Sequence, residues 1–558
     1  MNDNAPTLTA RKASKPRIAI GLLLSALVLN LVLITPNQTR AFTWDALQMV
    51  PLELPFILFA LWLMPAQARF TRIARVVLVT WLMLLTVARL ADIGTFIAFD
   101  RGFNIVVDWN LITAGFLTLL ATIGSLSTLL AVLGLTLALV ALAYVLWLAT
   151  GAWAKLGVSP AWRRAATAGL VGSLILVVTD TSYALQRWGW GAPTPGDAYS
   201  TRQTVGYVQQ WVSAFKGLRQ FNLMASLDPF AKNQQRLSKL DHRDVLIIFI
   251  ESYGRSSFQN PLYAPTHINT LTKAQKSLND KGVAMRSGWL SAPMVGGQSW
   301  LSHSTLASGL WVSDQGRYRA LMQSQRQTLF HYAQQAGFRT AAIMPGIRMA
   351  WPEGEFYGFD AIYDADMLGY KGLPFNWVTM PDQFTLKAMD RLIRQPSKTK
   401  PLRDAPLFAQ IALISSHAPW LPIPPVIDWD AIGDGQIFNQ WATSAETPEQ
   451  VWRDQDRVRD QFRQAVDYSL QTVFSYAEQH ADDPPLIIIV GDHEPARFVS
   501  QNPNKTVAMH VLGPPELVAR INDWGWTDGL IPDEALTPWR MDTFRDEFLH
   551  AFSDGVTQ

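Results

Sequence analysis

The chain has no cysteine among its 558 residues. This absence excludes disulfides, thiolate metal ligands and cysteine nucleophiles together. An excess of charge of one sign is missing too, because 47 Lys and Arg against 45 Asp and Glu leave a formal net charge of +2. Such a balance gives no support to nucleic-acid binding. A chain without thiols suits either redox compartment, so its compartment has to be inferred from topology.

Charged residues are scarce in the first third of the chain, where long apolar runs take their place. These runs lie at residues 18–35, 49–64, 76–99, 126–148 and 165–185. A membrane-spanning helix needs about 20 apolar residues, and the second run is marginal by that measure. Residues 111–123 are also apolar, and they either extend the fourth span or form a short re-entrant segment. We therefore expect an α-helical transmembrane domain of five spans over residues 1–187.

Basic residues set the orientation of these spans, because cytoplasmic loops are enriched in Lys and Arg. Such residues lie before the first run, between the second and third, and between the fourth and fifth: Arg11, Lys12, Lys15, Arg17, Arg69, Arg72, Arg75, Lys155, Arg163 and Arg164. With five spans, this pattern puts the N-terminus in the cytoplasm and everything after about residue 185 outside. A cleaved signal peptide is the alternative for the first run, but a small-residue cleavage site is missing.

Three ionisable residues, Glu53, Arg89 and Asp92, lie near the predicted outer ends of their spans. Ionisable groups at such places are costly and often functional. One interpretation is that they pair with each other or reach the interface. The other is a binding site for a lipid head group that faces the outer domain.

Residues 188–243 connect the membrane domain to the C-terminal part of the chain. Trp188-Gly-Trp-Gly is typical of an interfacial aromatic anchor that leads into a loop. Apolar residues then recur at helical spacing, which predicts an amphipathic helix: Val208, Trp211, Val212, Phe215 and Leu218. This helix either lies on the membrane surface or packs against the soluble domain. The polar residues 233–243 end the linker.

A soluble domain is predicted over residues 244–558. Three continuous apolar runs, 245–250, 411–414 and 486–490, are typical of buried parallel strands. Helical patterns lie between them, for example at 328–336 and 461–479. The alternation predicts an α/β sheet with helices on both faces.

Each predicted strand ends in polar residues that are suited to chemistry. Ligands of α/β sheets collect at the carboxyl ends of the strands, so Glu251, His417, Asp492 and His493 should meet at one edge. Two carboxylates and an imidazole suit one divalent metal such as Zn or Mn. A hydroxyl could complete the ligand set and be activated as a nucleophile.

The stretch MVGGQSWLSHSTLASG, residues 294–309, can supply this hydroxyl. Its two glycines permit a tight turn, and a helix is predicted to start close by. A serine at a helix N-terminus faces unpaired N–H groups and the positive end of the helix dipole. That environment favours a covalent phosphate on the serine oxygen, although the pattern alone does not choose among several hydroxyls.

The order of these motifs resembles the alkaline phosphatase and sulfatase superfamily. Its elements are a strand-ending Glu251, a serine before a helix, a strand-ending Ser-His-Ala-Pro, and Gly-Asp492-His493. Five spans ahead of such a domain are similar to the membrane phosphotransferases, namely the lipoteichoic acid synthases and the phosphoethanolamine transferases. The resemblance implies metal-dependent transfer of a phospholipid head-group phosphate, phosphoethanolamine or phosphoglycerol, to an envelope glycan or lipid. An outer domain behind five spans suits a multi-pass protein of the bacterial inner membrane with a periplasmic catalytic domain, and a Gram-positive cell surface is the alternative.

The resemblance also points to one hydroxyl. Sulfatases carry a Cys/Ser-x-Pro-x-Arg signature ten positions before a Thr/Ser-Gly pair. Counting ten positions back from Gly309, which follows Ser308, gives Ser299 as the nucleophile and fourth metal ligand. The Pro and Arg of the signature are missing, which disfavours a true sulfatase. Ser302 and Thr305 remain the alternatives.

Residues for substrate binding follow from the same resemblance. In lipoteichoic acid synthases a His, a Trp and an Arg bind the glycerol phosphate. Trp351 matches the Trp, whereas the other two positions fall on Met344 and Glu353, so Arg348 is the candidate replacement cation. Further candidates for contact with the substrate are His417, His303 and Arg497. For His303 and Arg497, an exposed helix residue and an ordinary surface arginine are the alternatives.

Two rival functions remain open at the level of sequence. The first is a hydrolase of the same fold, a phosphodiesterase, phosphatase or atypical sulfatase, which would release the head group without an acceptor. The second is a non-catalytic envelope scaffold, which would bind no metal.

Overall fold

The computed structural model describes residues 15–554 except 186, 188–194, 232–235, 395–404 and 444–445. The predicted anchor at 188–191 and the basic residues 11 and 12 lie outside this part of the chain. Two compact units form: residues 1–97 with 101–216, and residues 217–558 with 98–100.

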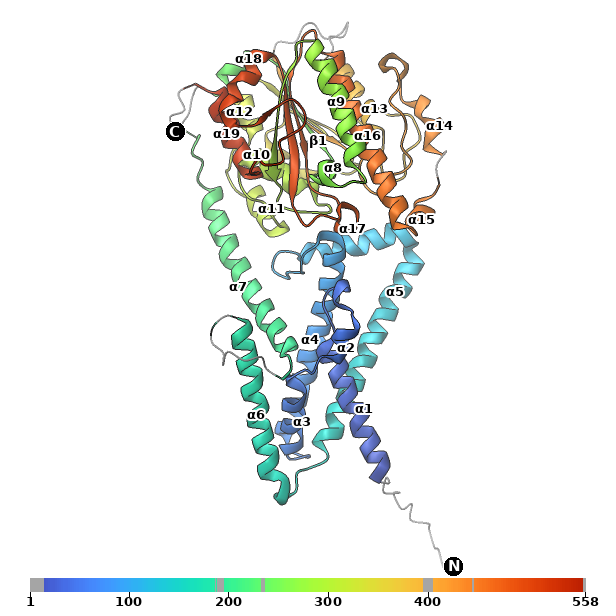
Figure 1. Cartoon of the computed structure of the whole chain (residues 1–558), viewed down its shortest axis with the longest axis vertical. Coiled ribbons are helices and arrows are strands. Elements are labelled where there is room, and N and C mark those ends of the chain that lie inside the picture. Colours follow the sequence, from blue (N-terminus) through green and yellow to red (C-terminus); the bar gives the residue numbers. More distant parts are fainter. Residues whose placement is uncertain are drawn as a thin grey trace, which may run out of the picture. The chain divides into compact units, whose positions relative to one another are not determined.

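Among its described residues, the first unit contains four helices that are long and apolar enough to cross a membrane (Figure 1). They are α1 (Lys15–Ile34), α4 (Arg69–Phe99), α5 (Trp109–Ala154) and α6 (Pro160–Ala184). The apolar stretch 111–123 extends α5, but across a kink at Gly124, whose φ of 79° is not helical. The spanning part of α5 is Gly124–Ala154.

The second predicted span is shorter than expected. It folds as α3 (Glu53–Leu63), which has 11 residues and follows the short α2 (Trp44–Gln48). At 1.5 Å per residue, such a helix is about 16 Å long, against about 30 Å for a bilayer core. Ile57 and Leu61 of α3 nevertheless share one buried apolar cluster with residues of α1, α4 and α5.

The predicted amphipathic helix is α7 (Tyr199–Ala225). Its apolar side chains Val208, Trp211, Val212 and Phe215 are exposed. An exposed apolar face agrees with the predicted location on a membrane surface, which stays a prediction.

The second unit is built on a nine-stranded mixed sheet in the order β4-β3-β5-β1-β6-β7-β2-β8, with β9 beside β2. The strands are β1 (Val245–Ile250), β2 (Ala284–Ser291), β3 (Arg339–Ile343), β4 (Ala361–Tyr363), β5 (Leu407–Leu413), β6 (Leu486–Gly491), β7 (Thr506–Gly513), β8 (Thr527–Asp528) and β9 (Trp539–Arg540). Strands β4, β3, β5, β1 and β6 are parallel, as predicted, and the three predicted strands are the neighbours β5, β1 and β6. Strand β7 is antiparallel to β6 and β2, which the sequence did not indicate.

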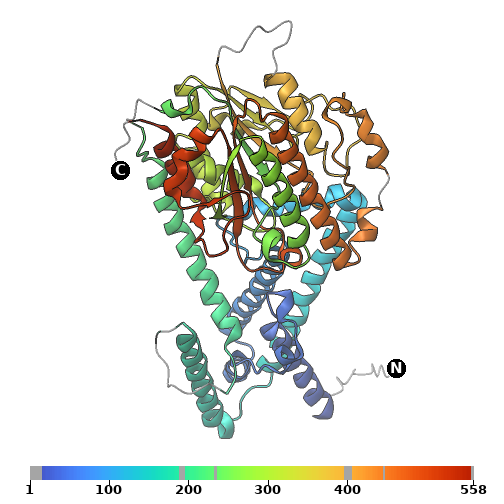
Figure 2. The same cartoon turned by 45° about the horizontal axis from the view of Figure 1, so that its top comes forward.

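Two apolar cores cover the two faces of this sheet. Side chains alternate along a strand, so Leu246, Ile248 and Ile250 enter one core and Val245, Ile247 and Phe249 the other. The first core is covered by α9 (Ala264–Asp280), α13 (Asp382–Met389) and α16 (Gln455–Gln479), and the second by α10 (Ser299–Ser308), α12 (Leu329–Gln335) and α19 (Phe544–Phe552). Figures 1 and 2 show these helix groups on opposite sides of the strands, so the predicted α/β architecture is confirmed.

Shorter helices complete this unit: α8 (Ser256–Gln259), α11 (Gln315–Met322), α14 (Asn439–Ala442), α15 (Pro448–Val451), α17 (Arg497–Ser500) and α18 (Pro515–Val518). Gln315 and Tyr318 of α11 line a cavity beside Ser299.

Candidate active site

The carboxyl ends of β1 and β6 place two carboxylates side by side. Ile250 pairs with Gly491 in the parallel register, so Glu251 and Asp492 follow at the same edge of the sheet. A Cβ at Gly491 would lie 1.8 Å from the carbonyl oxygen of Tyr253. Only glycine therefore lets the two strand ends approach this closely.

His493 joins the two carboxylates. Its Nε2 lies 3.1 Å from Glu251 Oε1 and 3.6 Å from Asp492 Oδ2. Its Nδ1 lies 2.9 Å from the carbonyl oxygen of Glu494, which fixes the ring with Nε2 toward the carboxylates. We call Glu251, Asp492 and His493 the metal cluster, because their donor atoms all lie within 4.8 Å of one another.

Burial and the charges of neighbouring groups shift the pKa values of all three residues of the metal cluster. Burial and the charge of Glu251 raise the pKa of Asp492. Burial alone would lower the pKa of His493, but Asp492 and Glu251 outweigh it and raise this pKa to about 9. For Glu251 burial opposes the charged form, yet the charge and hydrogen bond of His493 keep the pKa below its ordinary value.

The donor set fits a divalent cation. Asp492 Oδ1 accepts hydrogen bonds from the backbone N–H of Ser252 at 2.8 Å and of His493 at 2.7 Å. Asp492 Oδ2 is buried and accepts none. A buried carboxylate oxygen that accepts no hydrogen bond, beside a second carboxylate and an imidazole nitrogen, is an arrangement that Zn or Mn would satisfy. The role of the cluster as metal ligands stays a prediction.

Ser299 is the first residue of α10 and faces the metal cluster. Its Oγ donates a hydrogen bond to Glu251 Oε2 at 2.8 Å and lies 3.3 Å from His493 Nε2. Gln298 before it adopts a left-handed φ of 65°, which turns the chain sharply into the helix. The N–H groups of the first turn of α10 thus start at the same place as the Ser299 hydroxyl.

The two alternative hydroxyls serve the fold. Ser302 Oγ donates to the carbonyl oxygen of Asp492 at 2.6 Å. Thr305 Oγ1 donates to the carbonyl oxygen of Leu301 at 2.7 Å and accepts from the N–H of Val312 at 3.1 Å. Both side chains are fully buried. This geometry favours Ser299 among the three candidates.

A cavity of about 380 Å³ opens beside Ser299. Glu251, Ser299 and Asp492 line it together with aromatic and polar side chains of α10, α11, β5 and residues 344–357. These are Trp300, His303, Gln315, Tyr318, Trp351, Glu353, Tyr357 and Gln410. The metal cluster therefore meets a space with room for a small head group.

The predicted substrate residues divide into two groups. Trp351 and His303 line the cavity, whereas Arg348, His417 and Arg497 are not among its lining residues. Arg348 and His417 have exposed side chains, and Arg497 begins α17. The charge of His417 still contributes to lowering the pKa of Glu251, so His417 lies near the cluster.

His303 is 6% exposed, and its Nε2 is buried without a hydrogen-bond partner. Burial lowers the pKa of His303 to about 4, so the ring is neutral at pH 7. A neutral ring with an unpartnered nitrogen in a cavity wall is available to a bound molecule.

Sequence reasoning missed several lining residues. Gln410 is a polar residue inside the apolar strand β5 and is 1% exposed, which was a readable signal. Tyr318 and Gln315 come from α11, where no motif marks them. Glu353 entered the sequence analysis only as the residue at which the substrate-binding Arg of the lipoteichoic acid synthases is missing.

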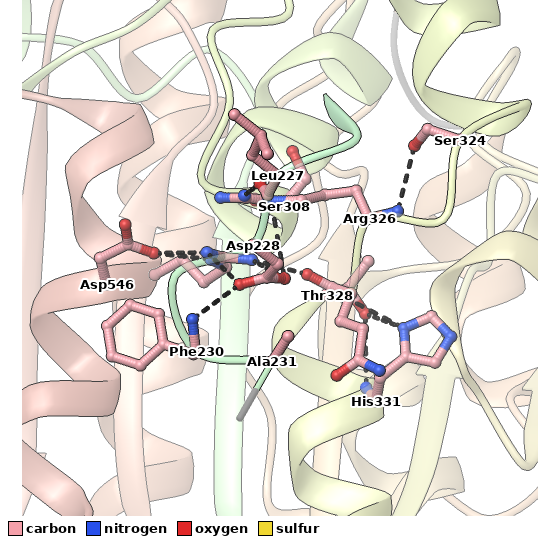
Figure 3. Close-up of polar contacts among 12 residues, drawn as sticks. Leu227, Asp228, Phe230, Ala231, Ser308, Ser324, Arg326, Thr328, His331 and Asp546 are labelled. Carbon is pink, nitrogen blue, oxygen red and sulfur yellow. Dashed lines mark hydrogen bonds and ion pairs between the residues drawn. The ribbon is translucent and has the colours of Figure 1, made fainter. Parts of the chain in front are cut away.

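The other end of α10 is held by a second set of buried charges (Figure 3). Arg326 Nε donates to the carbonyl oxygen of Ser308, the last residue of α10, at 2.9 Å, and another N–H of Arg326 donates to Leu227. Arg545 donates to both oxygens of Asp228, at 3.1 and 3.3 Å. We call Asp228, Arg326 and Arg545 the α10 clamp.

In the membrane unit, the predicted head-group residues Glu53, Arg89 and Asp92 are 3%, 1% and 2% exposed. Arg89 donates to Gln203 and Ser200 of α7 at 2.7 and 2.8 Å and to carbonyl groups of α1. Asp92 accepts hydrogen bonds from Tyr207, Asn37 and Phe103. Glu53 accepts one from Thr201 through Oε1, and its Oε2 is buried without a hydrogen-bond partner. These contacts favour the structural interpretation, in which the three residues fasten α7 to α1, α3 and α4.

Residues 243–510 match the family model described as Sulfatase. This part of the chain is therefore a sulfatase-family domain, as the motifs had indicated. A comparison with curated proteins found no match.

Solved structures similar to this chain include the lipoteichoic acid synthase LtaP from Listeria monocytogenes, with 13% sequence identity and a TM-score of 0.34. The match covers 52% of this chain and 71% of that chain. The phosphoglycerol transferase GacH of Streptococcus pyogenes, in complex with sn-glycerol-1-phosphate, has 13% identity, coverage of 54% and 74%, and a TM-score of 0.33. The soluble domain of lipooligosaccharide phosphoethanolamine transferase A from Neisseria meningitidis has 11% identity, coverage of 56% and 87%, and a TM-score of 0.34. Similarity at this level does not establish which substrate this protein uses.

Proposed function

We propose that this protein is a membrane-bound, metal-dependent phosphotransferase. It moves a phospholipid head-group phosphate, phosphoethanolamine or phosphoglycerol, to an envelope glycan or lipid through a covalent intermediate on Ser299. The observation that carries the proposal is the Ser299 hydroxyl, which lies 2.8 Å from Glu251 at the start of α10 and beside the metal cluster.

The reaction takes two displacements at phosphorus. In the first, Ser299 Oγ forms a bond to the phosphorus of the donor lipid, the bond from phosphorus to the diacylglycerol oxygen breaks, and the serine proton ends on diacylglycerol. In the second, an acceptor hydroxyl displaces Ser299 and returns a proton to it. Glu251, Asp492 and His493 would hold a divalent metal, which would supply positive charge to lower the pKa of a nearby hydroxyl and to stabilise phosphate.

The protein contributes position and electrostatics. The start of α10, where Ser299 lies, offers backbone N–H groups and the positive end of the helix dipole to the phosphate oxygens of the intermediate. His303 Nε2, buried and unpartnered in the cavity wall, is placed to hydrogen-bond the transferred group. His417, near Glu251, is assigned to the departing or accepting oxygen. The exposed His417 is thus assigned to the oxygen that leaves or attacks, and the buried His303 to the transferred group.

The membrane unit keeps the domain close to its lipid donor, which raises the effective concentration of that donor. We propose that α3, although it is shorter than a bilayer core, is the fifth crossing, because its core is shared with α1, α4 and α5. Five crossings from a cytoplasmic N-terminus put the catalytic domain in the periplasm of a bacterial inner membrane.

The test uses purified full-length protein in vesicles with labelled donor lipids, with and without Mn²⁺ or Zn²⁺. We expect metal-dependent release of diacylglycerol, abolished in Ser299→Ala and retained in Ser302→Ala. Release of free phospho-head-group at the same rate with and without every acceptor offered would instead establish a hydrolase. A protein that binds no metal and releases no diacylglycerol would support the scaffold alternative.

A further inference from the structure

The wall of the cavity outside the metal cluster has an unusual composition for a site that handles phosphate. Five aromatic side chains line it: Phe249, Trp300, Tyr318, Trp351 and Tyr357. Glu353 is the charged side chain of this wall, and no Lys or Arg lines the cavity among the residues that the structure describes. The sole imidazole of the wall, His303, is neutral at pH 7 because of its burial.

Glu353 lies close to the aromatic side chains. It belongs to the short 3₁₀ helix Pro352–Tyr357, directly after Trp351. Burial is the largest cause of the raised pKa values of Tyr318 and Tyr357, and the charge of Glu353 adds to both. The carboxylate is itself exposed, so it can turn toward a ligand in the cavity without the cost of burying a charge.

The charges of a site that contains both metal and donor lipid indicate which head group would suit Glu353. A divalent cation is balanced by Glu251 and Asp492, so the phosphodiester of a bound donor brings one net negative charge. Glu353 brings a second. An uncharged head group would leave both uncompensated, whereas an ammonium on the head group would pair with Glu353. An ammonium would also be attracted to the faces of the neighbouring aromatic rings.

We propose that Glu353 and the aromatic wall select a phosphodiester whose head group carries an ammonium, as ethanolamine does, over one with an uncharged glycerol. The proposal rests on the proposed function, because it assigns the donor of the same reaction. It makes Glu353 a specificity-determining residue of this reaction.

The experiment measures kcat/KM for diacylglycerol release from ethanolamine and glycerol phospholipids separately, with full-length protein and saturating metal. We expect wild type to prefer the ethanolamine lipid by on the order of tenfold. Glu353→Gln should lose most of this preference, and Glu353→Lys should reverse it. Glu355→Gln is the matched control, because Glu355 is exposed on the same 3₁₀ helix and does not line the cavity.

Binding provides a second readout. Quenching of tryptophan fluorescence by soluble phosphoethanolamine and glycerol phosphate reports head-group preference without turnover, and the Glu353 variants should change the ratio of the two affinities. Release of diacylglycerol from neither lipid would overturn the proposed function. Turnover with equal or better use of the glycerol lipid, or an unchanged ratio in Glu353→Gln, would overturn this inference and leave the transferase intact.

Discussion

The two ends of helix α10 both meet buried charges, but the two sets differ in how completely those charges are paired. In the α10 clamp, Arg545 donates to Asp228 and Asp546, and Arg326 donates to the carbonyl groups of Ser308 and Leu227. In the metal cluster, two carboxylates share one imidazole, and Asp492 Oδ2 has no hydrogen-bond partner. The clamp is complete within the protein, whereas the cluster leaves one buried carboxylate oxygen without a hydrogen bond.

This difference separates a structural role from a functional one. A buried ion pair whose partners are all present holds a fold together, and it is costly to break because one charge stays behind unpaired. The metal cluster holds its groups buried with raised pKa values for Asp492 and His493, and buried groups perturbed in this way are candidates for function. We infer that the clamp holds α10 in place so that Ser299, at the opposite end, meets the cluster.

Breaking the clamp should have the largest effect on stability. Asp228→Ala leaves Arg326 and Arg545 without their shared carboxylate, which should cost about 3–5 kcal/mol and lower Tm by roughly 10 °C. Thermal unfolding of the full-length protein with and without metal checks this, and the loss should be the same in both conditions. Asp430→Asn is the control, because its pair with Lys387 is exposed and should contribute under about 1 kcal/mol. A loss no larger than that of the control would contradict the role of the clamp.

Breaking the metal cluster should have the opposite effect on the metal-free protein. Asp492→Asn removes the carboxylate whose pKa is raised by burial and by Glu251, so the metal-free Tm should rise or stay constant. Metal affinity should nevertheless fall at least about 100-fold. Calorimetric metal titration and thermal unfolding measure the two properties on one sample. A lower metal-free Tm together with unchanged metal affinity would show that Asp492 is a structural residue.

The pH dependence of metal binding should show a smaller effect of the same cluster. The folded pKa of His493 is raised to about 9, so the stabilisation from its proton is present at low pH and lost as pH rises through about 9. Because a metal has to displace this proton, its apparent affinity should increase with pH, by up to about tenfold per unit below pH 9. Mn²⁺ titrations at about pH 6.5 and about pH 8.5 measure this, and an affinity that is constant or falls with pH would contradict it.

The sequence predicted the parts of the site that follow directly from strands. Continuous apolar runs indicated β1, β5 and β6, and the polar residues after two of them, Glu251 and Asp492, do lie together. This worked because parallel strands bring their carboxyl ends to one edge whatever their separation in the chain.

The parts that depend on tertiary packing were not predictable. Arg326 and Arg545 resemble surface charges in sequence, yet they are 4% and 0% exposed, because their partners come from residues 227–228 and from carbonyl groups of other segments. Arg348 was expected to replace a missing cation, but it is exposed and does not line the cavity. The cavity wall of α11 also carries no motif, since only the fold brings Tyr318 near Ser299.

The central claim is that Ser299 carries the phosphate of the donor head group between the two displacements. The most direct test is to trap the metal-loaded full-length protein with donor lipid in the absence of acceptor, measure its intact mass, and locate any adduct by peptide mapping. We predict one head-group phosphate on the peptide that contains Ser299, at Ser299 itself, in wild type but not in Ser299→Ala. An adduct on Ser302 or Thr305, or release of diacylglycerol by Ser299→Ala at the wild-type rate, would contradict the claim.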